Sequence, residues 1–327
     1  MTFINGPDQY RPIPPKDDRV VGGVLNDKGV QLHEGLFYYE RPQTIESAVE
    51  LTEALTERIL AAPADASMQA YQYWSEAGWK TEHGTYSSAD RFGEKAFEEH
   101  EELRVAMLGL SRCRPDEVEL FRQQVLHELG DVAWCVNALS SNSSAALDSS
   151  MKNMLYSYVM GINHVVNGED SKPRWRDYGA QLATKYELLT IGDIEELITA
   201  GFEPTESTAM NVYPDGNYDE RDAEEHLTSL LMCLMNMRSL SEQQYGYGGE
   251  MDFGPVRIMI ERSEYEDMSK IIGELAARAM LHVAFLSDRV LGQPLSAPIG
   301  HNVSVISQRI SLNLIDKSDG PRPDALR

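Results

Sequence analysis

The chain has 327 residues, 42% of them hydrophobic and 25% charged, which is the balance of an ordinary globular protein. Its 52 acidic and 29 basic residues give a formal net charge of −23, which argues against a nucleic-acid partner because backbone binding requires basic patches. There is no apolar run of membrane-spanning length, no secretion-signal order at the N-terminus, and only three scattered cysteines. A cytoplasmic protein without a membrane partner is predicted.

The predicted elements are nearly all helices. Residues 1–43, rich in Pro, Gly and Asp, predict an irregular arm with a short hairpin near residues 19–39. Thr44 is expected to cap the first helix, and Pro63 to end it. Helices are then predicted over residues 45–62, 67–79, from Ser87 or Ser88 through Glu102, from Pro115 through Asp131, and over 145–166, 190–200, 222–243, 262–292 and 298–315.

Short connections between these helices predict an all-α helical bundle. The expected division is an irregular N-terminal arm (residues 1–43), a helical unit (44–166), a linker region with one short helix (167–221), a second helical unit (222–315) and a tail (316–327).

Two pairs of acids carry the chemistry, Glu99 with Glu102 and Glu128 with Asp131. Each pair has i, i+3 spacing, so its members share one face of a helix. A helical wheel places Glu99 inside the apolar stripe of its helix and Glu102 at the edge, and Glu128 and Asp131 also fall beside apolar positions. A carboxylate aimed at a core is costly unless it is paired or bound to metal. An all-oxygen site for a hard cation such as Mg²⁺ is therefore predicted.

The alternative is an ordinary solvated face, because acidic clusters are common in so acidic a chain. The same wheel turns Glu98 and Glu101 toward solvent. His100, beside the first acid pair, is a candidate for phosphate contact, but a surface histidine is the favoured expectation.

The order Glu99-x-x-Glu102, a spacer of residues 103–127, then Glu128-x-x-Asp131 resembles the all-α nucleotide pyrophosphohydrolases of the MazG type. Relatives of that family include the dimeric dUTPases and phosphoribosyl-ATP pyrophosphatase. The run ELGDVAW (128–134) is similar to the family's ELGD segment, which continues into a hydrophobic helix. The resemblance covers roughly residues 67–160, and motif matches of this kind are hypotheses.

The resemblance implies a Mg²⁺-dependent enzyme, with Mn²⁺ as a substitute, that converts a (d)NTP to the (d)NMP and pyrophosphate. It makes Glu99, Glu102, Glu128 and Asp131 catalytic metal ligands, one of which, for example Glu102, could serve as general base instead. A rival from another class is a catalytically inactive helical nucleotide-binding or scaffold protein.

Three further residues are candidates for substrate binding: Lys152, Asn153 and Trp79. Lys152 and Asn153 lie roughly where family members place phosphate-contacting residues, and the alternative for both is an exposed helix face. Trp79 is a candidate wall for a nucleobase, against the alternative of core packing.

The acidic segments recur in the second half of the chain. Residues 223–227 (AEEHL) repeat the pattern of 97–101 (FEEHE), and residues 273–277 (GELAA) that of 127–131 (HELGD). In this copy Thr228 follows Glu225 and Ala277 follows Glu274, so each pair has lost one acid. A tandem duplication with a structural second half is predicted, as an intrachain pseudo-dimer or a subunit of a homodimer. Chance recurrence is the alternative.

Overall fold

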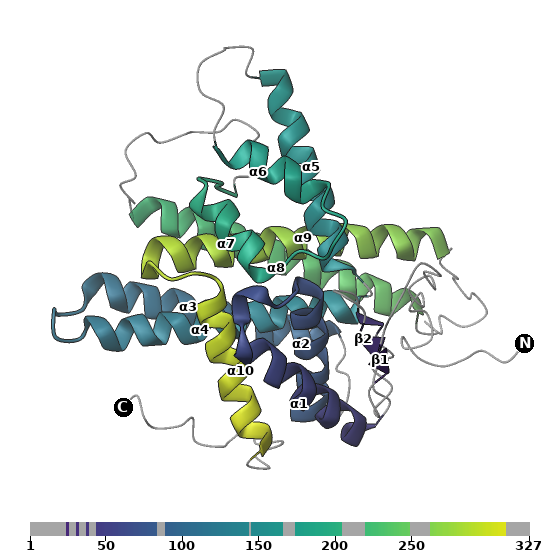
Figure 1. Cartoon of the computed structure of the whole chain (residues 1–327). Helices are drawn as coiled ribbons and strands as arrows, with labels where there is room; N and C mark the ends of the chain where they lie inside the picture. Colours follow the sequence, from purple (N-terminus) through teal and green to yellow (C-terminus); the bar gives the residue numbers. More distant parts are fainter. Residues whose placement is uncertain are drawn as a thin grey trace, which may run out of the picture.

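Helices dominate the architecture, as Figure 1 shows for a computed structural model of the chain. The structure describes residues 24–25, 31–32, 37–38, 44–83, 89–143, 145–165, 174–204, 220–248 and 262–311. The α-helices are α1 (Ile45–Ala61), α2 (Met68–His83), α3 (Ala89–Arg112), α4 (Val118–Asn142), α5 (Leu147–Val165), α6 (Arg174–Ala183), α7 (Ile191–Thr199), α8 (Glu220–Gly248), α9 (Arg262–Leu286) and α10 (Ser296–Ser311). The predicted all-α class is confirmed.

The remaining elements are short. A 3₁₀ turn, η2 (Pro63–Asp65), follows α1, and a π-helical turn, η3 (Ser287–Leu291), continues α9. In the arm, β1 (Val24–Leu25), β2 (Gln31–Leu32) and β3 (Phe37–Tyr38) pair antiparallel in that order, where a hairpin was predicted. The rest of the arm, Ser87 and Ser88, and the predicted tail lie outside the described residues.

Local sequence signals set most helix ends. Thr44 caps α1 in a capping box with Ser47, each side chain accepting from the other residue's backbone N–H at 3.1 Å. The predicted start of helix α4 at Pro115 was wrong, because the helix begins at Val118. Residues 115–117 form a turn instead, in which Glu117 N donates to Arg114 O at 2.9 Å.

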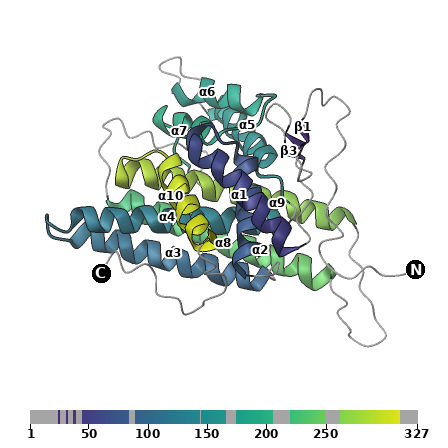
Figure 2. The same cartoon turned by 60° about the horizontal axis from the view of Figure 1, so that its bottom comes forward.

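Two long helical hairpins form the centre of the fold. Helices α3 and α4 run alongside each other, α8 and α9 form a second pair, α8 also packs on α3, and α9 on α4 (Figure 2). Helix α10 crosses α4 and also contacts α1, so the end of the described chain returns to the first half (Figures 1 and 2).

The buried hydrophobic residues form a single cluster that extends from α1 to α10. Helix α6 was not predicted, and it packs into this cluster through Trp175, whose ring meets Phe202 edge-on at 5.1 Å. Segment 174–204 is tied to the first half by backbone bonds from Met68 N to Leu189 O and from Ile191 N to Ala66 O. Among the described helices, none has the length and apolar content needed to cross a membrane.

Candidate metal centre

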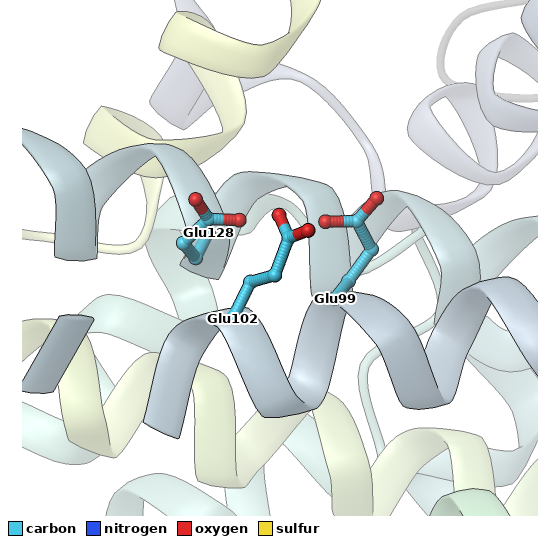
Figure 3. Close-up of side chains that lie close together, drawn as sticks. All are labelled: Glu99, Glu102 and Glu128. Carbon is cyan, nitrogen blue, oxygen red and sulfur yellow. The ribbon is translucent and has the colours of Figure 1, made fainter. Parts of the chain in front are cut away.

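Three carboxylates converge between the long helices of the first hairpin. Glu99 and Glu102 project from α3 and Glu128 from α4, and Figure 3 shows their oxygens facing one another. One oxygen of each lies within 4.8 Å of the corresponding oxygens of the other two. Glu99 is 3% exposed and Glu128 7%, whereas Glu102 is partly buried. These acids therefore do not form a solvated face.

Helical periodicity explains why α3 turns acids inward. Leu103 and Ala106 are buried on the stripe that also carries Glu99, one turn before Leu103. Glu98 and Glu101 are exposed, as predicted, and Glu101 accepts from Arg104 Nε at 2.8 Å. The wheel therefore separates the inward acids of this helix from the solvated ones.

Glu99 carries the clearest electrostatic signature of the site. Its Oε1 forms an ion pair with Lys95 Nζ, and its buried Oε2 has no hydrogen-bond partner among the described residues. Burial raises the pKa of Glu99 above its usual range, the charge of Asp131 adds to that effect, and Lys95 opposes it. Burial alone lowers the pKa of Lys95, but the carboxylate of Glu99 outweighs it and the net shift is upward. Lys95 therefore does not offset the combined effect of burial and the neighbouring acids on the pKa of Glu99.

Asp131 is buried near the cluster, but it is not one of the three converging acids. Asn302 Nδ2 of α10 donates to its Oδ1, and His127 Nε2 lies 3.4 Å from its Oδ2. The sequence predicted that all four acids together hold one or more metal ions. The structure gathers three of them and holds the fourth beside them through α10.

Close approach of two helices makes that contact possible. A Cβ on Gly130 would lie 2.5 Å from Pro298 O and 2.8 Å from Asn302 Cβ, so only glycine allows α10 this close to α4. His301 of α10 also meets the His127 ring edge-on, with ring centroids 5.4 Å apart. Burial and then the charge of His127 lower the pKa of His301.

Several residues near the site were missed from the sequence. Asn302 lies 171 positions from Asp131, and no local pattern announces such a contact. Lys95 could have been found, because its i, i+4 spacing to Glu99 places the two on one helix face.

The three predicted substrate-binding residues lie on α5 and α2. Lys152 of α5 bonds Asp148 Oδ2 at 3.0 Å and donates to Glu187 O at 2.7 Å. Asn153, also on α5, is exposed. The ring of Trp79 is buried against Trp134, with centroids 5.1 Å apart. Their roles in substrate binding stay predictions.

The second hairpin carries no comparable cluster among its described residues. Glu225, Thr228 and Glu274 are exposed, and Ala277 is buried. Its buried polar pair is instead His226 with His282, whose Nδ1 atoms lie 2.9 Å apart. The tandem duplication stays a prediction.

His100 corrects another expectation. The ring is buried instead of lying on the surface, and its Nε2 lies 2.8 Å from Leu227 O of α8. It is a contact between the two hairpins.

The donor set suits a hard divalent cation. Mg²⁺–oxygen bonds of about 2.0–2.1 Å place octahedral ligands about 2.9 Å apart when adjacent and about 4.2 Å when opposite. Oxygens within 4.8 Å of one another need only small side-chain shifts to reach those separations. All three donors are carboxylates, which suit hard cations such as Mg²⁺, Mn²⁺ or Ca²⁺ better than metals that prefer sulfur or imidazole ligands. The buried, unpaired Oε2 of Glu99 is also the kind of group that a cation satisfies.

No family model, curated protein or solved structure matches this chain. The chemistry of the site has to be derived from its own residues.

Proposed function

We propose that the protein is a Mg²⁺-dependent nucleotide pyrophosphohydrolase that converts a (d)NTP and water to the (d)NMP and pyrophosphate, with Mn²⁺ as a substitute ion. The observation that carries the proposal is the group of three carboxylates from two adjacent helices, two of them buried. The resemblance of the acidic spacing and of the ELGD segment to MazG-type enzymes supports the same chemistry.

The charge of the chain explains the need for a cation. A triphosphate is an anion and is repelled by a chain of net charge −23, most strongly beside a cluster of acids. When bound, a divalent ion neutralises phosphate oxygens and lowers the pKa of a water, which makes hydroxide available near neutral pH. Glu99 and Glu128 would hold the ion from the protein side, with Glu102 beside it. Asn302 and His127 keep Asp131 beside them, so its negative charge adds to the attraction for the cation.

Each acid has its own part in the reaction. Glu99 and Glu128 are the more buried and serve as ligands. Glu102 is the most exposed of the three, so a water at the mouth of the site reaches it, and it is the general base of the proposal. The water oxygen attacks the α-phosphorus, its proton passes to Glu102, and the bond between the α-phosphorus and the bridging oxygen breaks. Pyrophosphate leaves with the electron pair of that bond.

The second hairpin has a structural part in this proposal. Helix α8 packs on α3 and α9 packs on α4, which covers faces that a second subunit would otherwise have to bury. The chain is then an intrachain pseudo-dimer that draws on the soluble nucleotide pool of the cytoplasm.

An inactive helical scaffold is the weaker candidate. Enclosing carboxylates between helices costs free energy, and a scaffold gains nothing from that cost. In an ion-binding site, the free energy of binding the ion offsets the cost of burying the carboxylates.

A pyrophosphate-release assay tests the proposal. The common (d)NTPs are each supplied with Mg²⁺ and then with Mn²⁺, and turnover of at least one is expected. Glu128→Gln should lower that rate at least about 100-fold, because it removes a ligand that acts on the transition state. Its circular dichroism should be unchanged.

The matched control is Glu101→Gln, an exposed acid of α3, which should retain the full rate. No turnover with any nucleotide would favour the inactive binding protein. Full activity of Glu128→Gln would remove Glu128 from the mechanism.

A further inference from the structure

Lys95 lies at the boundary between the buried acids and solvent. It precedes Glu99 by one helical turn on α3, and its Nζ forms an ion pair with Glu99 Oε1. The Lys95 side chain is 33% exposed while that of Glu99 is 5% exposed. The side chain of Lys95 therefore contacts a candidate metal ligand and is itself partly exposed to solvent.

The Lys95 ammonium has more N–H donors than the ion pair with Glu99 uses. A lysine carries three N–H donors, and Glu99 takes one of them. The nearest oxygen of Glu98, an exposed side chain, is 3.6 Å away and beyond hydrogen-bond distance. Among the described residues, these two carboxylates are the ion-pair partners of Lys95. At least one N–H can therefore reach a group that arrives from solvent.

We infer that Lys95 binds a phosphate oxygen of the substrate at the mouth of the acidic cluster, a role that rests on the proposed function and names its anion-binding residue. An incoming phosphate meets the charges of Glu99, Glu102, Glu128 and nearby Asp131. A charge-assisted bond from the protein offsets part of that repulsion. Lysine suits this role, because its ammonium is a compact charge with three rotatable N–H donors. One donor can remain bonded to Glu99 while another donates to a phosphate oxygen.

This position gives Lys95 opposite effects on the two ligands. Lys95 and a divalent ion are both cations attracted to the Glu99 carboxylate, so the lysine weakens binding of the ion alone. For a phosphate, the same charge is attractive. A residue whose only role was to stabilise α3 would not lower the affinity for one ligand and raise the affinity for the other.

Two binding measurements on Lys95→Met test the inference without any turnover. Mn²⁺ affinity is measured by electron paramagnetic resonance without an anion, and we expect it to increase about 3- to 10-fold. Methylenediphosphonate, which has no hydrolysable bridge, is then titrated calorimetrically at saturating Mn²⁺ for each variant. Its affinity should fall about 10-fold in Lys95→Met, and Lys95→Arg should stay within about 3-fold of the unsubstituted chain.

Lys270→Met removes the same charge at an exposed site on α9 and should change neither affinity. Lys152→Met tests the lysine that the family resemblance favours, and a loss of diphosphonate binding there with none in Lys95→Met would overturn the inference.

Glu128→Gln separates this inference from the proposed function. If it abolishes Mn²⁺ binding while Lys95→Met changes neither affinity, only the role of Lys95 is overturned. If it leaves Mn²⁺ binding intact, the metal centre itself is overturned, and the role of Lys95 with it.

Discussion

Among single residues, Glu99 shows what enclosing a carboxylate at the candidate metal site costs in stability. Its carboxylate is enclosed between α3 and α4, and its pKa is raised by burial and by Asp131 in spite of the Lys95 ion pair. The folded chain therefore holds a proton on Glu99 more tightly than the unfolded chain does. Between the ordinary pKa of a glutamate and the raised value, the folded state binds more protons, so the free energy of unfolding falls as pH rises. Above that window Glu99 is a constant destabilising charge.

Replacing Glu99 by Gln should therefore raise the melting temperature at pH 7 by a few degrees in the presence of EDTA. The gain should shrink toward zero as pH falls below the ordinary pKa of glutamate, because the native side chain is then neutral in both states. Thermal melts followed by circular dichroism from acid to neutral pH measure it. Glu94→Gln, at an exposed position of the same helix, should change nothing. A lower melting temperature for Glu99→Gln would mean that the ion pair with Lys95 is net stabilising.

Added Mn²⁺ should reverse that order. A ligand that binds only the native state stabilises a protein by mass action. The melting temperature of the unsubstituted chain should therefore rise with Mn²⁺, and that of Glu99→Gln should rise much less. Equal gains in the two chains would place the bound ion elsewhere.

For whole elements, the contact between α4 and α10 determines how the fourth acid is held. Gly130 lies in the ELGD segment, and its missing side chain lets Pro298 and Asn302 reach α4. Asn302 then donates to Asp131, one residue after the glycine. A sequence feature that resembles a family motif therefore also has a packing role in this chain.

Gly130→Ala should destabilise the protein by about 1–3 kcal/mol, because the new methyl group overlaps the backbone of α10 and forces the helices apart. The matched control is Gly78→Ala in α2, where the added Cβ would meet atoms no closer than 3.8 Å. That variant should be stabilised by about 0.5–1 kcal/mol, since alanine is the better helix former. Urea unfolding measures both. Equal effects at the two glycines would show that α10 moves aside freely.

For the whole molecule, one hydrophobic core joins the two hairpins. Buried residues run without a break from α1 to α10, and bonds such as His100 to Leu227 and Ser143 to Ser241 link the halves. The candidate metal site on the first hairpin is therefore supported by packing against the second, although the second contributes none of the three carboxylates.

Unfolding should accordingly be a single transition. Trp74, Trp79 and Trp134 lie in the first half of the chain, and Trp175 lies in α6, which follows it. All four are buried and none lies in α8 or α9, so fluorescence reports the part of the molecule outside that hairpin. Far-ultraviolet circular dichroism reports every helix, including α8 and α9. In urea the two signals should have the same midpoint, and Mn²⁺ should shift both equally. A second transition seen only by circular dichroism would mean that the α8–α9 hairpin unfolds separately.

The sequence alone was sufficient for the features that depend on near neighbours. Thr44 and Pro63 bound α1 because caps and breakers act within one turn, and the inward side of α3 follows from helical periodicity. Only the tertiary structure decided how Asp131 is held, that His100 is buried and how closely α10 approaches Gly130. Each of these depends on elements distant in the chain, and their relative placement comes from packing the helices around a shared core, which local sequence patterns do not encode.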